Sequence, residues 1–144
     1  MDEIRIGRVS SVNYQDGTVM VTYSDRGGSV TGELPMISNG VYNMPYIGQW
    51  VTVLHNSNGG EAGIVIGTSW GEGNQPPAWG EAVYRRDMGN EAGGSAYEEF
   101  DATSGEYRMH VNGAEIRIGK DGAITISSPV GIRFDAPKVE GGGA

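Results

Sequence analysis

Short runs in which apolar and polar residues alternate dominate the first seventy positions of the chain. Val19, Val21 and Tyr23, for example, alternate with Met20 and Thr22. A period of two places successive side chains on opposite faces of a β-strand. Glycines interrupt every stretch that could otherwise carry the apolar spacing of a helix. The pattern predicts strands at 4–12, 19–23, 50–54 and 62–67, and a short strand that ends near Leu34-Pro35.

Glycine-containing turns separate these predicted strands. Asp16-Gly17, Arg26-Gly27-Gly28 and Asn58-Gly59-Gly60 favour tight turns, because glycine adopts a positive φ without a steric penalty. One longer, irregular connection covers residues 35–48. Five short strands arranged in this way are typical of a small, partly open Greek-key barrel of the OB type. A small SH3-like barrel would give a similar pattern.

The second half of the chain carries an eight-residue repeat. Ile116, Ile124 and Ile132 are separated by eight residues each, and polar residues fall between the apolar ones. Alternation with a period of two, nested inside a fixed longer period, is typical of a β-solenoid. The same spacing of eight relates Ile118, Ile126 and Phe134. Met109 and Val111 alternate in the same way upstream, and Phe100 is a candidate start of the series.

One chain is poorly able to bury this repeat by itself. Two large apolar residues contribute about 3–6 kcal/mol per repeat when fully buried, whereas ordering eight residues costs on the order of 8–16 kcal/mol in backbone entropy. Eight residues are also too few to encircle a core, since a single-chain β-helix uses about 20 or more per coil. Three chains, each supplying one face of a triangular prism, would satisfy the strand edges and bring the apolar faces together on an axis. The predicted trimer core is Met109, Val111, Ile116, Ile118, Ile124, Ile126, Ile132 and Phe134. The alternative is a small β-meander packed on the barrel.

Composition and charge narrow the possible functions. Apolar residues make up 38% of the 144 positions, 25 residues are glycine and none is cysteine, so disulfides and thiolate metal sites are excluded. The net charge of −8 is opposite to that of a typical nucleic-acid binder. The sequence shows no signal peptide and no apolar run of transmembrane length. We therefore expect synthesis in the cytoplasm. The strand pattern and the repeat predict three segments, which are an OB-fold head (1–70), a connector (71–95) and a stalk (96–144).

Residues with catalytic or metal-binding chemistry are sparse. Glu98, Glu99 and Asp101 form the densest carboxylate group, but no predicted helix or cleft holds them as a glycosidase pair. His110 alternates in phase with Arg108, which predicts an outward-facing position rather than a ligand. We therefore predict no enzyme activity, no cofactor and no metal site.

Two groups of motifs resemble those of one known family, the central spike (baseplate assembly protein V type) of contractile phage tails and related injection systems. In the first half they are Ile6-Gly7-Arg8-Val9, Gly48-Gln49-Trp50-Val51 and Gly63-Ile64-Val65-Ile66-Gly67. In the second half they are Ile116-Arg117-Ile118-Gly119-Lys120-Asp121-Gly122 and Ala136-Pro137-Lys138-Val139. The resemblance covers most of the chain outside the connector.

The resemblance implies an all-β homotrimer in which an N-terminal OB-fold barrel precedes an intertwined triangular β-helix. The head would sit on the hub and tube proteins of a particle baseplate, and tail contraction would drive the stalk through the envelope of a target cell. Many spikes of this family bind iron through a His-x-His pair near the tip, but His55 and His110 are unpaired and far from the C terminus, so that site is not carried over. The Gly-rich end at 141–144 is either a platform for a separate tip-capping protein or a frayed terminus.

A second hypothesis is an OB-fold binding module for single-stranded nucleic acid or saccharide. Such modules combine a basic groove with aromatic side chains on which bases stack. Only Arg5, Arg8 and Arg26 are basic in the first seventy residues. Six carboxylates oppose them, namely Asp2, Glu3, Asp16, Asp25, Glu33 and Glu61. This balance disfavours phosphate binding.

Overall fold

The computed structural model describes residues 3–56, 62–89 and 93–142. These residues form two antiparallel β-sheets, and their one helical element is the 3-10 turn η1 (Ser24–Arg26). The prediction of an all-β fold is confirmed. Residue contacts divide the chain into two compact units: Met1–Pro77 with Asp87–Gly94, and Ala78–Arg86 with Ser95–Ala144. No helix in the described part of the chain is long and apolar enough to cross a membrane.

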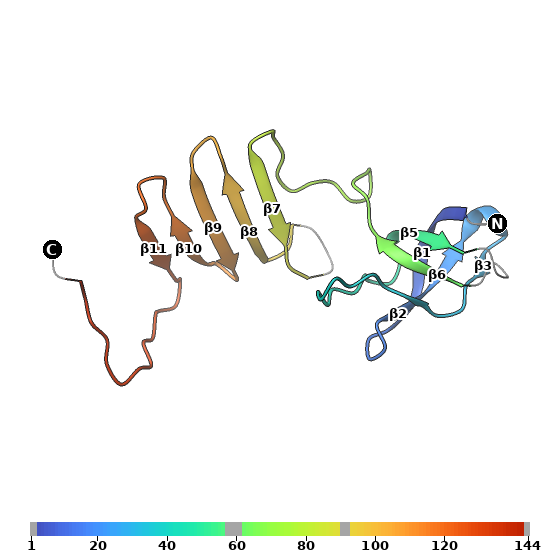
Figure 1. The fold of residues 1–144 in the computed structure, drawn as a ribbon, viewed down its shortest axis with the longest axis horizontal. Coiled ribbons are helices and arrows are strands. Elements are labelled where there is room, and N and C mark those ends of the chain that lie inside the picture. The colour runs from blue at the N-terminus through green and yellow to red at the C-terminus, as the bar shows by residue number, and fades with distance from the viewer. Residues whose placement is uncertain (1–2, 57–61, 90–92, 143–144) are drawn as a thin grey trace. The chain divides into compact units, whose positions relative to one another are not determined.

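The first sheet follows the predicted strands closely and has the order β3-β2-β1-β5-β6, with β4 beside β2 (Figure 1). The predicted turn at Asp16-Gly17 joins β1 to β2, and Gly17 has a φ of 71°. The backbone N–H of Asp16 donates to Oδ1 of Asn13 (3.1 Å), which is the local bond that favours Asn at turns. The predicted turn at 58–60 lies outside the described residues. The strands are β1 (Glu3–Asn13), β2 (Thr18–Tyr23), β3 (Ser29–Val30), β4 (Leu34–Pro35), β5 (Trp50–His55) and β6 (Gly63–Gly67).

Strand β1 lies at the centre of this sheet and pairs with a different strand along each half of its length. Its first half, Glu3 to Arg8, pairs with β5, and its second half, Arg8 to Asn13, pairs with β2. The β1–β2 register shifts between Val9 and Ser11. A bulge of this kind bends a strand and increases its twist, so β1 curls the sheet around one apolar side.

Contacts between β4 and β6 bring the two ends of the curled sheet together. An isolated parallel bridge joins Met36 to Val65, and the N–H of Ile37 donates to the carbonyl oxygen of Val65 (2.9 Å). The described residues nevertheless do not complete a closed barrel. The fold prediction therefore holds as an all-β chain with two antiparallel sheets, and not as a closed OB barrel.

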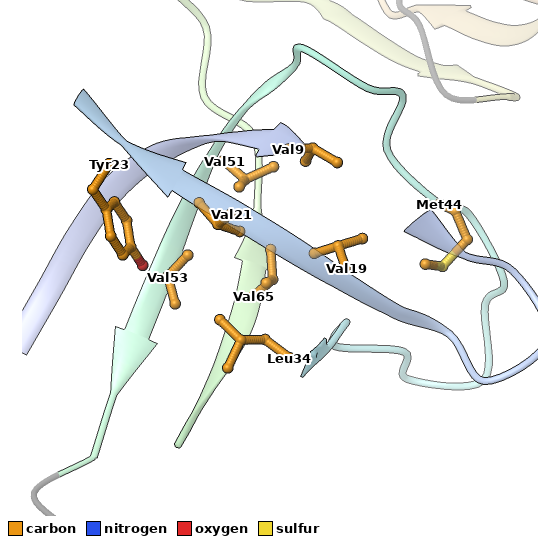
Figure 2. Packing of buried hydrophobic residues seen from close by; sticks show 9 residues of the cluster. All are labelled: Val9, Val19, Val21, Tyr23, Leu34, Met44, Val51, Val53 and Val65. Carbon is orange, nitrogen blue, oxygen red and sulfur yellow. The ribbon is translucent and has the colours of Figure 1, made fainter. Parts of the chain in front are cut away.

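The core of this unit lies on the concave side of the curled sheet. Val21, Val53 and Val65 have no exposed surface, and Figure 2 shows them meeting there with side chains from the neighbouring strands and with Met44 from the 36–48 connection. The period of two in β2 and β5 places every second side chain in this cluster. Its members are Val9, Val19, Val21, Tyr23, Leu34, Met44, Val51, Val53 and Val65.

One polar pair is buried at the edge of this core. His55 is 2% exposed, and its Nε2 lies 2.5 Å from the hydroxyl of Tyr23. Burial raises the pKa of the Tyr23 phenol, although Arg5 opposes the shift. The Arg5 guanidinium lies over the Tyr23 ring, 4.1 Å from its centroid, and donates to Asp25 (2.7 Å).

The second sheet is a meander with the order β11-β10-β9-β8-β7. Gly105 (φ 71°), Asn112 (φ 51°) and Gly113 (φ 86°) make its tight turns possible. Strands β8, β9 and β10 therefore have both neighbours in the same chain, whereas we expected other chains to supply them. The strands are β7 (Val83–Asp87), β8 (Ala96–Asp101), β9 (Glu106–Val111), β10 (Ala114–Ile118) and β11 (Ile124–Ser127).

The eight-residue repeat also predicts a strand at Ile132 and Phe134, after those that contain Ile116 and Ile124. This strand is absent, since residues 128–142 contain no strand. Ser128 Oγ accepts hydrogen bonds from the backbone N–H groups of Val130 and Gly131. Pro129 has no N–H to donate to a ladder. The chain thus turns away from β11 before it reaches the next apolar pair of the repeat.

Replacing Gly7 with alanine tests the close packing of β1 on β2. A Cβ atom at Gly7 would lie 2.5 Å from Cγ1 of Val21 and 2.8 Å from the carbonyl oxygen of Thr22. Because one of these neighbours is backbone, we expect Gly7→Ala to lower the free energy of unfolding by about 1–3 kcal/mol. Gly32→Ala, where a Cβ meets nothing within 4 Å, is the control in urea denaturation. Equal stability of the two variants would contradict the packing described here.

Candidate functional site: the apolar face of the second sheet

The register of β9, β10 and β11 places six of the predicted core residues on one face of the second sheet. Ile116 pairs with Met109 on one side and with Ile126 on the other. Ile118 pairs with Ile124, and Val111 with Ala114. Directly paired residues in a sheet point to the same side. We call this surface the apolar face, defined as Met109, Val111, Ile116, Ile118, Ile124 and Ile126.

All six side chains of the apolar face are open to solvent in the single chain, with exposures from 36% for Met109 to 66% for Ile124. Ile132 (49% exposed) and Phe134 (69% exposed) lie beyond β11, where no strand holds them beside the other six. The structure therefore brings six of the eight predicted residues together and leaves two apart.

The apolar face becomes more polar toward β8. Phe100 pairs with Tyr107, which pairs in turn with Ile118, so Phe100 extends the face as its place in the sequence suggested. Glu98 pairs with Met109 and accepts a hydrogen bond from the Tyr107 hydroxyl (2.8 Å). This bond raises the pKa of the Tyr107 phenol, because ionisation would break it beside a carboxylate. Glu98 thus has a partner on this face.

The opposite face of the same sheet is a polar network centred on Glu115. Its carboxylate lies 3.1 Å from Nδ1 of His110, 3.6 Å from Nε of Arg108 and 3.6 Å from Nε of Arg117. These side chains come from β9 and β10, and all are only partly exposed. His110 lies beside Arg108, as the alternation predicted.

Stacked planar groups continue this network across β8 to β7. The rings of Tyr97 and His110 are parallel within 16°, with centroids 5.0 Å apart. The guanidinium of Arg85 lies 3.7 Å from the centroid of Tyr97 and donates to Glu99 (3.1 Å). Sequence reasoning missed this network, because its members meet only once the strand register is known. Most of these polar side chains pair with one another, although Nε of Arg117 makes no hydrogen bond, and a polar face of this kind suits contact with water.

The carboxylates considered for catalysis do not form a pair. Glu98 and Glu99 occupy opposite faces of β8, and Asp101 accepts the N–H of Thr103 (2.8 Å) in the turn that follows. Within residues 3–56, 62–89 and 93–142, no group of three or more His, Asp or Glu side chains could hold a metal ion. What the second sheet offers is therefore an apolar surface for packing against another surface.

No family model matches the sequence, and no curated protein is significantly similar to it.

Removing the Glu115 carboxylate tests the polar network. Because Glu115→Ala leaves Arg108, Arg117 and His110 without their shared partner, we expect it to lower the free energy of unfolding by about 1–3 kcal/mol. Asp135→Ala is the control, since Asp135 and its partner Arg133 are more than 85% exposed and such pairs contribute about 0–1 kcal/mol. Thermal unfolding followed by circular dichroism measures both changes. Equal losses would show that the network contributes no more than an exposed pair.

Proposed function

We propose that this chain is the structural central spike of a contractile tail or injection-particle baseplate, and that it works as a homotrimer. The observation that carries the proposal is the contrast between the two faces of the second sheet. One face holds the Glu115 network, and the other exposes six large apolar side chains. An exposed apolar patch of this kind marks a surface that packs against another protein surface.

Strand length supports three copies of the sheet rather than four. Strand β9 has six residues and β10 has five, so they span about 17–20 Å at about 3.4 Å per residue. In a triangular prism with sides of this length, each sheet lies about 5 Å from the axis, which is half of the roughly 10 Å between packed sheets. Four sheets would leave an interior about twice as wide, too wide for these side chains to fill. Two copies that pack face to face would also keep the usual distance of about 10 Å between sheets. The mass of the assembly in solution therefore has to decide between two copies and three.

In this proposal each side of the prism is the meander of one chain, with the apolar face inward. The polar network around Glu115 then forms the outer surface of the stalk and keeps it soluble during assembly. Beyond β11, the repeat positions Ile132 and Phe134 continue the stalk toward its tip as an intertwined triangular β-helix. Association with the other two chains supplies the strand neighbours that a single chain lacks there.

For the first unit we propose an OB-type head that attaches the trimer to the hub and tube proteins of the particle. The order β3-β2-β1-β5-β6, the bulge in β1 and the parallel bridge between Met36 and Val65 support this topology. On contraction the stalk is driven through the envelope of the target cell, a mechanical role that needs no covalent chemistry.

A groove on the first unit favours a binding module as the second candidate function. It encloses about 430 Å³ and contains Arg8, Tyr46, Gln49 and Trp50. The Arg8 guanidinium lies 4.5 Å from the centroid of the Trp50 ring. Aromatic and planar polar side chains of this kind suit a saccharide or a stacked base.

Substituting Ile124 tests whether the apolar face holds the trimer together. Ile124→Asp would place three carboxylates on a dry axis, so we expect the trimer to dissociate to monomers at micromolar concentration. Thr125→Asp is the matched control, because Thr125 is the next residue of β11 and points to the opposite face. Light scattering after size-exclusion chromatography measures the mass. An intact trimer in Ile124→Asp, or equal dissociation of both variants, would overturn the inward assignment of this face.

A further inference from the structure

The first sheet also carries apolar side chains on the side that faces away from its core. Ile4 pairs with Leu54, and Leu54 pairs in turn with Ile64, so the three side chains share one surface. Ile4 is 69% exposed, Ile6 62% and Leu54 41%. The alternating residues of the same strands, such as Val53 and Val65, already fill the core. We call the exposed surface the outer patch, defined as Ile4, Ile6, Leu54 and Ile64.

A β-strand exposed on one side normally carries polar residues there. At the Ile4–Leu54 end of β1 and β5 this exposed side is instead apolar, whereas the other side of β1 carries Glu3 and Arg5. Thr52, which pairs with Ile6, is the one polar residue inside this area. Nothing in the core explains the apolar side chains of the outer patch, because they point away from it. Exposing a surface of this kind to water lowers the solubility of the protein, and covering it removes that cost.

The charge around the outer patch is unlike that of the rest of the chain. The chain has a net charge of −8, yet the one charged residue paired along this side of β1 and β5 is Arg8, opposite Trp50. Arg8 lies on the Trp50 ring and makes no ion pair with a described residue. Glu3 and Arg5 belong to the other side of β1, where they meet Asp25 and Arg26. Copies of an acidic chain repel one another least where no carboxylate is present.

We infer that the outer patches of neighbouring heads pack against one another in the homotrimer. The chain would then associate with its copies through two surfaces, the apolar face of the stalk and the outer patch of the head. The inference rests on the proposed trimer, because the stalk holds three heads at a high local concentration that makes a small apolar contact sufficient. Arg8 lies four residues along β1 from Ile4, about 14 Å away at the usual rise. Copies that meet at the Ile4–Leu54 end therefore leave Arg8 at the polar rim of the contact, where interface charges are normally found.

The absence of cysteine from the chain allows a direct cross-linking test on the full-length protein. Single variants Ile4→Cys and Ile6→Cys are treated with a short bis-maleimide reagent after their trimeric mass has been checked. Because three cysteines around one axis allow one linked pair per trimer, we expect about two thirds of the chains to appear as cross-linked dimers. Val41→Cys is the control, since Val41 is similarly exposed (47%) but lies in the loop between β4 and β5, and we expect it to remain unlinked.

A second variant keeps the test independent of cross-linking geometry. Ile6→Glu introduces a carboxylate into the outer patch, and we expect it to raise the concentration at which the trimer dissociates by about tenfold or more, whereas Val41→Glu leaves it unchanged. A trimer with no link at Ile4 or Ile6 and no effect of Ile6→Glu would overturn the inference and assign the patch to a different protein, while the proposed spike would stand. If Val41→Cys were cross-linked to the same extent, the links would reflect random collisions of the heads, and the inference would also be overturned. A monomer would overturn both proposals.

Discussion

The second sheet exposes an apolar face, and within the described residues of that sheet no side chain covers it. Its five strands satisfy their hydrogen bonds within one chain except at the outer edges of β7 and β11, so strand pairing does not force association. The apolar face, however, still needs to be buried, because Ile116 and its paired neighbours Met109 and Ile126 remain exposed. Because hydrophobic burial is the main favourable term in folding, a sheet with this face uncovered is at best marginally stable. In the proposed trimer two further copies cover the face, which would stabilise the sheet and assemble the stalk in the same step.

The opposite face of the second sheet, which carries the Glu115 network, is suited to water instead. Glu115 serves three basic side chains, and Tyr97 and His110 stack between Arg85 and Glu115. Groups that already pair with one another lose little by facing water and would lose much by being buried against an apolar surface. The two faces are thus not interchangeable, and the inward direction in the proposed prism follows from the side chains. In the first unit the same logic points to the outer patch, where Ile4 and Ile6 lack the polar partners that surround Arg5 on the other side of β1.

Much of this architecture can be predicted from the sequence because its signals are local. The alternation of Val19, Val21 and Tyr23 and the turn at Asp16-Gly17 predict a hairpin, and the structure has it at those residues. The repeat correctly predicts that Ile116, Ile118, Ile124 and Ile126 share one face. It does not reveal that turns at Gly105 and Asn112-Gly113 fold the strands into a meander of one chain, since a spacing of eight suits both a hairpin and a solenoid. Nor does it show that Ser128 and Pro129 end the sheet before Ile132. The Glu115 network depends on the register of β9 against β10, which no local pattern specifies.

The most direct test of the account is the mass of the unaltered chain in solution, measured by sedimentation equilibrium over a range of micromolar concentrations. One chain has a mass of 15.2 kDa. Three apolar faces that meet on one axis predict a single species with three times this mass at every concentration. A species with twice the mass would indicate a two-sheet sandwich, and a stable, soluble monomer would mean that the chain covers its own apolar face. Either result would contradict the three-chain stalk.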